Sequence, residues 1–149
     1  MSFHIIDLRE RPEVLPTLAH MLYEEFWRDV ADVSPDSLAD RLRLALTDAG
    51  LPLCLVALAG DTPVGLVNVI DYDDPNPRVG TPWLAGLVVD PAWRGQGVGS
   101  ELVRQALSHA KRCGEQQLFL GTDGPGFYRR LGAEVVQQTR DDFWIMRIG

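Results

Sequence analysis

With 149 residues, the chain is long enough to bury a hydrophobic core and short enough to form one domain. A hydrophobic fraction of 46% and a charged fraction of 23% are typical of a folded, soluble domain and argue against disorder. The net charge of −7 argues against nucleic acid or an anionic membrane as the main partner, because both require a basic face, and no apolar run approaches the length that spans a bilayer.

The start of the chain predicts a strand followed by a helix. Residues 3–8 form a short, largely apolar run typical of a strand. Pro12 then begins a helical pattern, since proline is favoured in the first turn of a helix. Apolar side chains recur along one stripe of this helix, at Leu15, Leu18, Leu22 and Phe26.

A second helix and a hairpin follow. Ser34-Pro35 has the composition of an N-cap and first turn, so a helix is expected from there to Gly50. Residues 53–59 and 64–70 are apolar runs that predict two strands. The tight turn around Gly60-Asp61 should join them as a hairpin. The next segment, 71–82, is rich in Asp, Pro and Asn and predicts a long surface loop.

An Arg/Gly turn, RGQGVG at residues 94–99, joins an apolar strand at 84–89 to an amphipathic helix that begins at Val98 and ends at Gly114. The first amides of a helix have no internal partner and carry a partial positive charge. Glycines allow an oxyanion to approach closely, and Arg94 adds a cation. The turn therefore predicts a site for phosphate or diphosphate.

Three kinds of phosphate-binding site have a comparable turn. A P-loop would need Gly-Lys-Ser/Thr, which does not follow Gly99. A dinucleotide site, as in an NAD-dependent oxidoreductase, favours G-x-G-x-x-G, whereas this chain has G-x-G-x-G. Coenzyme A is the third candidate.

The remainder of the chain predicts strands at 117–120, 134–138 and 143–148 and a short helix at 125–131. A strand-helix-strand unit has a right-handed crossover, so the strand at 84–89 and the one at 117–120 should be parallel. Their carboxyl ends then face one crevice, where ligands of open α/β sheets bind.

Two motifs in this half of the chain resemble the GNAT superfamily of N-acetyltransferases. Arg94-x-x-Gly97-x-Gly99 is similar to its diphosphate-binding signature, and residues 116–136, which carry Phe-Tyr-x-x-Leu-Gly at 127–132, are similar to its second motif. The resemblance implies one α/β domain over residues 1–149, with a mixed, mostly antiparallel sheet flanked by helices and a central parallel strand pair that splays. It also implies acetyl-CoA as co-substrate.

The resemblance assigns the binding of coenzyme A to the strand and the turn. Backbone groups of Leu87, Val88 and Val89 would bind the pantetheine arm. The diphosphate would lie on Arg94, Gly95, Gln96, Gly97, Val98, Gly99 and Ser100. The family often binds pantetheine through an asparagine, but Gly121 stands at that position, so the following loop or Asp123 would replace that contact.

The family's general acid matches Tyr128. Attack of an amine on the thioester releases a thiolate, and a phenol with a pKa of about 10 can protonate it. The simpler alternative, that the pair Phe127-Tyr128 packs the short helix on the sheet, is expected for Phe127.

The sequence leaves the general base open. Many family members carry a glutamate in the strand before the turn, but residues 83–89 contain no acid or base. Glu24, Asp71, Asp73 and Asp123 are candidates, although each is also compatible with a solvated surface carboxylate. The acceptor amine could also arrive already neutral.

In the resembled family the first two helices, the loop after the third strand and the C-terminal hairpin form the acceptor site. In this chain these regions combine aromatic and carboxylate side chains, which suit a cationic amine. The substrate-binding candidates are Trp27, Glu24, Tyr72 and Trp83. The predicted activity is transfer of an acetyl group to a primary amine of a small molecule, a peptide or a protein.

Two other functions stay open: an acyl-CoA-binding regulatory module without turnover, and a dinucleotide oxidoreductase. Cys54 and Cys113 are expected to be buried, reduced thiols, which suits a cytoplasmic protein, and the first residues lack the pattern of a secretory signal. The three histidines show no metal-ligand spacing, so no metal is expected. A homodimer is compatible with these features.

Overall fold

Seven strands form one sheet in the order β1-β2-β3-β4-β5-β7-β6 in the computed structural model, which describes residues 2–47, 50–71 and 80–149. Neighbouring strands are antiparallel, except that β4 and β5 are parallel. The predicted fold class, α/β with a mixed and mostly antiparallel sheet, is therefore confirmed. The strands are β1 (His4–Asp7), β2 (Leu53–Ala59), β3 (Thr62–Ile70), β4 (Trp83–Val89), β5 (Leu118–Thr122), β6 (Glu134–Arg140) and β7 (Phe143–Ile148).

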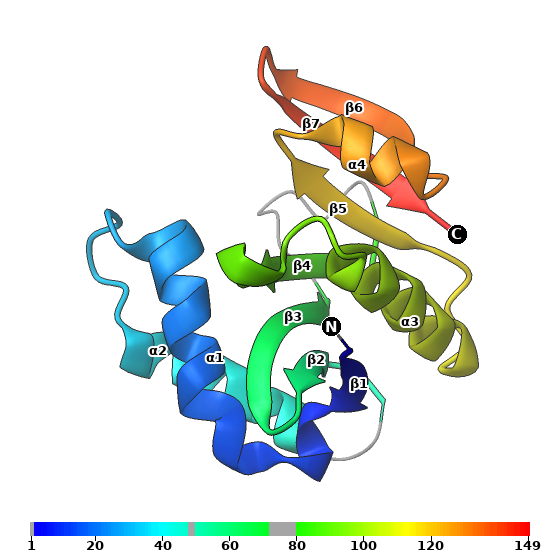
Figure 1. Ribbon diagram of the computed structural model, residues 1–149. Helices are drawn as coiled ribbons and strands as arrows, with labels where there is room; N and C mark the ends of the chain where they lie inside the picture. The colour runs from blue at the N-terminus through cyan, green and yellow to red at the C-terminus, as the bar shows by residue number, and fades with distance from the viewer. Residues whose placement is uncertain (1, 48–49, 72–79) are drawn as a thin grey trace.

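Helices cover both faces of the sheet (Figure 1). Along β2, alternate side chains starting from Leu53 pack with α3, and those starting from Cys54 pack with α1 and α2. Side chains of a strand point to opposite faces in turn, so burial on both faces explains why the whole of β2 is apolar. The α-helices are α1 (Leu15–Leu22), α2 (Pro35–Arg43), α3 (Val98–Arg112) and α4 (Pro125–Arg130).

The second helix begins as predicted and ends early. The Ser34 hydroxyl accepts a hydrogen bond from the Ser37 amide at 3.1 Å, which caps α2. Leu44–Leu46 continues the chain as a 3-10 turn, so the helix does not extend to Gly50. The predicted hairpin is confirmed as β2 and β3, joined at Gly60. Most of the expected loop at 71–82 lies outside the described residues.

The first helix differs from its prediction near its end. After α1, residues Tyr23–Trp27 form a π-helix, in which hydrogen bonds span five residues instead of four. Because of this wider turn, Trp27 and not Phe26 follows Leu22 on the apolar side of the helix. Trp27 therefore packs on the core, and Phe26 is 48% exposed. The prediction that Phe26 belongs to the core stripe is therefore wrong.

Strands β4 and β5 separate after a single register pair. Trp83 and Phe119 are the register pair between them in the described chain, and the Phe119 amide donates to the Pro82 carbonyl at 3.0 Å. Beyond this point the β5-facing edge of residues 85–89 has no strand partner among the described residues. The splayed parallel pair expected from the resemblance is thus present.

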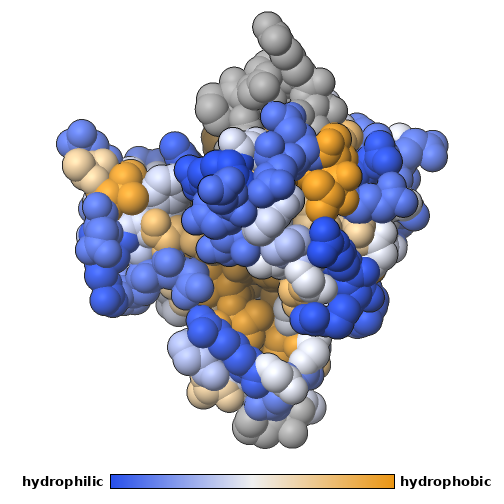
Figure 2. All heavy atoms as spheres, turned by 90° about the horizontal axis from the view of Figure 1, so that it is seen from above, coloured by the Kyte–Doolittle hydropathy of each residue, from blue (hydrophilic) through white to orange (hydrophobic). Residues whose placement is uncertain are grey.

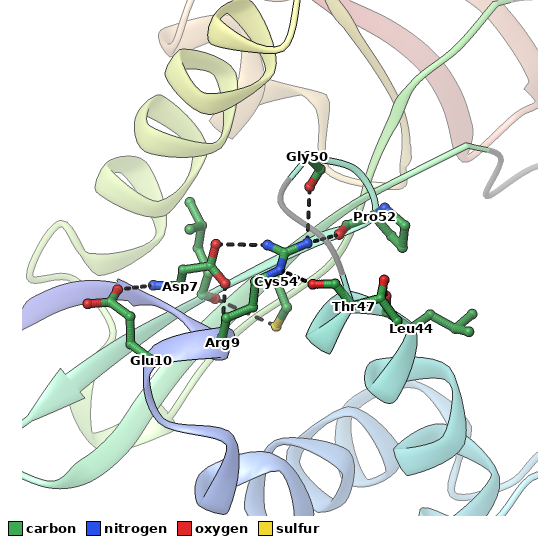
Figure 3. Close-up of polar contacts among 9 residues, drawn as sticks. Asp7, Arg9, Glu10, Leu44, Thr47, Gly50, Pro52 and Cys54 are labelled. Atoms are coloured by element: carbon green, nitrogen blue, oxygen red, sulfur yellow. Dashed lines mark hydrogen bonds and ion pairs between the residues drawn. The ribbon is translucent and has the colours of Figure 1, made fainter.

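An arginine clamp joins the start of the sheet to the segment before β2 (Figure 3). The Arg9 guanidinium donates to the carbonyls of Thr47, Gly50 and Pro52 at 3.0, 3.2 and 3.0 Å. It also pairs with the Asp7 carboxylate at 2.9 Å. Arg9 thereby fixes both ends of the connection between α2 and β2.

The two thiols lie in different environments. Cys54 is fully buried, and burial raises the pKa of its thiol, as expected for an inert core residue. Cys113 is exposed because α3 ends at Arg112 and the chain turns away, which corrects the prediction that it faces the core. Within the described ranges, no helix has both the length and the apolar character needed to cross a bilayer.

Candidate active site

The Arg/Gly turn presents free amides at the start of α3. The first helical hydrogen bond runs from the Glu101 amide to the Gly97 carbonyl at 3.0 Å, so the amides of Val98, Gly99 and Ser100 have no partner within the helix. Gly97 has a φ of 85°, which favours glycine, and a Cβ added there would meet no atom within 4 Å. The turn is therefore open to an anion from outside.

Local contacts hold this turn against the sheet. The Asp90 amide donates to the Val64 carbonyl at 2.8 Å, and the Asp90 carboxylate accepts from the Ala92 amide at 2.9 Å. The α3 backbone at Gly99 lies against α4, since a Cβ there would come within 3.4 Å of the Phe127 ring. Phe127 thus packs on the core as predicted.

Two clefts border β4. The turn cleft, of about 520 Å³, lies at the Arg/Gly turn and is lined by Glu25, Leu87, Val88, Val89, Trp93, Arg94, Gly95, Gly97, Val98, Gly99, Ser100 and Phe127. The bulge cleft, of about 730 Å³, lies beside the middle of β4 and includes Leu22, Glu25, Trp27, Arg41, Asn68, Ala85, Gly86, Leu87, Asp123, Tyr128, Arg140 and Phe143 in its lining. Because Glu25 and Leu87 line both, the two clefts adjoin.

The surface around the splayed strands is uneven. Seen from the top of Figure 1, the molecule is hollowed, with hydrophobic atoms on the floor of the hollow and hydrophilic atoms on its rim (Figure 2). Apolar surface exposed in this way is typical of ligand-binding clefts in soluble proteins.

A β-bulge shapes the strand between the clefts. Leu66 pairs with Val88 and Asn68 with Ala85, so β4 has one residue more than β3 in this stretch. Gly86 adopts a φ of 60° here, and a Cβ on it would come within 3.0 Å of Asn68 Nδ2 and of a Leu22 methyl group. The bulge therefore requires glycine at this position.

Arg94 contacts an acidic residue from the first helix. Its Nη2 lies 3.3 Å from Oε2 of Glu25, and its Nε donates to the Val89 carbonyl at 3.2 Å. Glu25 belongs to the π-helix, and its carboxylate is 42% exposed. The cation of the turn thus already has an anionic partner that an incoming phosphate would compete with.

Tyr128 lies at the bulge cleft with its phenol half-buried. Burial raises its pKa to about 12, so the phenol, like an exposed one, is protonated at neutral pH. Its ring meets Phe127 edge-on, with centroids 4.9 Å apart. The hydroxyl makes no hydrogen bond to any residue that the structure describes, which leaves it available to a ligand.

Most of the residues expected to bind coenzyme A line the turn cleft. Gln96 differs, since its side chain points back to the Ala92 carbonyl at 3.5 Å and lines neither cleft. Asp123 lines the bulge cleft together with Tyr128. At Gly121, a Cβ would lie only 2.8 Å from the Phe143 ring, so a larger residue there would require that ring to move.

The substrate-binding candidates are only partly brought together. Trp27 lines the bulge cleft as expected. Glu24 lines neither cleft, because its carboxylate pairs with Arg28 and with His20 at 3.7 Å on the helix surface. Trp83 is 1% exposed and donates from its indole to the Gly80 carbonyl at 2.7 Å, so it is a core residue instead of a substrate contact. Tyr72 lies outside the described residues.

Sequence reasoning missed several side chains of the bulge cleft. Glu25 belongs to the carboxylate-rich region expected to form the acceptor site, but its neighbour Glu24 was chosen as the candidate, and Glu25 is the residue that lines both clefts. Arg41, Arg140 and Asn68 come from α2, β6 and β3, and nothing in their local sequence marks them. Of the other candidate bases, Asp71 lines neither cleft and Asp73 lies outside the described residues.

The described residues contain no group of three His, Cys, Asp or Glu side chains arranged to hold a metal ion.

The splayed strands and the Arg/Gly turn at the start of α3 together form the architecture that the resemblance implies. A model of the Acetyltransferase (GNAT) family matches residues 19–133, which is more than half of the chain. Peptidyl-lysine N-acetyltransferase YjaB of Salmonella typhimurium is 32% identical over 122 residues, which cover 78% of this chain and 77% of that protein. The chain therefore belongs to the GNAT family of acetyltransferases.

Other similar proteins agree on the family and the fold. Human N-acetyltransferase 8B is 29% identical over 137 residues, which cover 88% of this chain and 60% of the human protein. The chain spans less than two thirds of the length of two of the curated relatives that it matches. A crystal structure of an aminoglycoside 6'-N-acetyltransferase complexed with coenzyme A superposes with a TM-score of 0.74 at 19% identity, covering 99% of this chain and 96% of that one.

Proposed function

We propose that the protein transfers the acetyl group of acetyl-CoA to a primary amine. The observation that carries the proposal is the junction of the two clefts at the β4 bulge, with the anion turn on one side and the Tyr128 phenol on the other. The diphosphate would bind the free amides at the start of α3 together with Arg94. The pantetheine arm would run along Leu87 to Val89, whose β5-facing edge has no strand partner among the described residues.

The chemistry that this arrangement supports is a direct transfer. The amine attacks the thioester carbonyl, a C–N bond forms, the C–S bond breaks, and the departing thiolate takes the phenol proton of Tyr128. The phenol is protonated at neutral pH and so can act as the acid, although the burial that raises its pKa also makes it a weaker acid than an exposed phenol. The attacking nitrogen loses a proton to solvent as the amide forms, and Tyr128 regains one from solvent.

The acceptor would lie in the bulge cleft. Its lining carries two carboxylates, from Glu25 and Asp123, and two guanidinium groups, from Arg41 and Arg140. It also includes the aromatic rings of Trp27 and Phe143. A cationic amine suits the carboxylates and the rings. The names of the similar proteins point to two acceptor types, aminoglycosides and peptidyl-lysine. Both contain primary amines, and both belong in the first screen of acceptors.

The runner-up is a module that binds acyl-CoA without turnover. The dinucleotide oxidoreductase has lost its support, since the chain belongs to an acetyltransferase family. The cytoplasmic location and the homodimer stay predictions.

Comparison of the wild type with Tyr128→Phe tests the proposal. Release of free thiol from acetyl-CoA is followed with a panel of small amines, aminoglycosides and lysine peptides. We expect the wild type to release CoA with at least one acceptor and Tyr128→Phe to be about 10²–10⁴-fold slower, because general acid catalysis contributes that much. CoA binding should be nearly unchanged in the variant.

Two results would count against this proposal. Binding of CoA by both proteins without release for any acceptor favours the module. Equal rates for both proteins would remove Tyr128 from the chemistry and leave the transferase activity intact.

A further inference from the structure

We propose that Glu25 couples the two clefts by exchanging partners: it pairs with Arg94 when the turn cleft is empty, and with the acceptor ammonium once coenzyme A has bound. This inference rests on the proposed function and adds a substrate-contacting residue to it. Its basis is the 3.3 Å contact between Glu25 Oε2 and Arg94 Nη2 and the position of Glu25 in the lining of both clefts.

The geometry favours such an exchange. Arg94 and Glu25 are 53% and 42% exposed, so solvent screens their ion pair and makes it weak. A diphosphate in the turn cleft offers more charge than a carboxylate and is also held by the α3 amides. Arg94 should therefore turn to the diphosphate when coenzyme A binds, which leaves Glu25 without its cation.

The freed carboxylate then faces the bulge cleft. An ammonium group entering that cleft would meet Glu25 next to Leu87, the other residue that both clefts share. Strand β4, which borders both clefts, carries no acidic residue of its own. Glu25 thus supplies at the junction the negative charge that the acceptor requires.

Proton transfer balances along this route. The ammonium gives one proton to the Glu25 carboxylate, directly or through water, and the neutral amine attacks the thioester. Glu25 passes the proton to solvent, to which it is partly open. As the amide forms, the attacking nitrogen loses its second proton to solvent, and this balances the proton that Tyr128 takes back after it has protonated the thiolate. The products are therefore the amide, free CoA thiol and one proton released to solvent.

Opposite effects on the two substrates distinguish this role from a structural one. With the Glu25→Gln variant, we expect acetyl-CoA to bind about two- to fivefold more tightly, because Arg94 no longer has to break an ion pair before it binds the diphosphate. This range corresponds to the strength of an exposed ion pair. We expect kcat/KM for the acceptor amine to fall by about 10²-fold, since the base and the ammonium partner are lost. Calorimetric titration and the thiol-release assay measure the two quantities.

Three variants complete the experiment. Glu13→Gln removes an exposed carboxylate outside both clefts and controls for net charge. Glu24→Gln tests the neighbour that the sequence favoured. In the Arg94→Gln background, Glu25→Gln should no longer tighten acetyl-CoA binding, since the pair is already broken. Higher salt should also reduce the gain in affinity.

The outcomes separate the two proposals. A wild type that does not bind acetyl-CoA, or binds it without turnover, contradicts the proposed function. An active wild type whose Glu25→Gln variant matches Glu13→Gln in both measurements contradicts the coupling alone. Loss of amine turnover in Glu24→Gln, with Glu25→Gln unaffected, would return the acceptor contact to Glu24.

Discussion

At the scale of a single residue, Gly97 is the position on which anion binding at the Arg/Gly turn depends most directly. Its φ of 85° and the open space beside it let phosphate oxygens approach the start of α3. We expect Gly97→Ala to weaken CoA binding about tenfold or more, because the methyl group would project into that space. The same methyl should lower the free energy of unfolding by about 1–2 kcal/mol, the strain of a left-handed backbone.

Gly114 provides a matched control at the other end of α3. Its φ is 93°, and a Cβ there also meets nothing within 4 Å. Gly114→Ala should therefore lose similar stability and keep wild-type CoA affinity, as measured by urea unfolding and by calorimetry. Equal affinity in the two variants would mean that CoA does not bind against Gly97.

Sequence reasoning succeeded best where one residue type alone fits. The positive φ of Gly97 follows from its place between strand and helix, and the position of Tyr128 follows from the family motif. It failed for Trp83, because an indole is equally suited to a core and to a substrate site. Only the packing of Trp83 against Phe119 decides between the two.

At the scale of elements, the π-helix at Tyr23–Trp27 decides which aromatic side chain packs on the core. A helix of regular period would keep Phe26 on the stripe below Leu22. The π-helix places Trp27 there instead and leaves Phe26 exposed. Hydrophobic periodicity cannot reveal such an insertion, because it assumes one period throughout.

Arg9 should matter for stability and not for catalysis. Its planar guanidinium donates to three carbonyls from a segment more than 35 residues away, a geometry that lysine cannot reproduce. We expect Arg9→Lys to lower the free energy of unfolding by about 1–3 kcal/mol in urea titrations.

Arg11→Lys is the control for this prediction, since Arg11 lies nearby and makes exposed ion pairs with Glu13 and Asp61. Its effect should be within about 1 kcal/mol. If both variants lose the same stability, the carbonyl contacts of Arg9 are not what stabilises the connection before β2.

At the scale of the whole molecule, the strand-helix-strand unit β4-α3-β5 determines where the site lies. The right-handed crossover rule predicted that these two strands are parallel. Parallel strands have their carboxyl ends at the same edge of the sheet, which predicted the shared crevice. The bulge at Gly86 and the charged lining of the bulge cleft could not be predicted, because they depend on contacts among β3, β4, β6 and α2. Local sequence thus predicted the Arg/Gly turn between strand and helix, whereas tertiary packing determines the lining of the bulge cleft.

A crystal structure of the protein grown with coenzyme A tests the central claim most directly. We expect the diphosphate on the amides of residues 97–100 with Arg94 turned toward it, and the pantetheine beside Leu87 to Val89. The thiol should lie within hydrogen-bonding distance of the Tyr128 hydroxyl. Coenzyme A bound elsewhere on the molecule, with the turn cleft empty, would contradict the account.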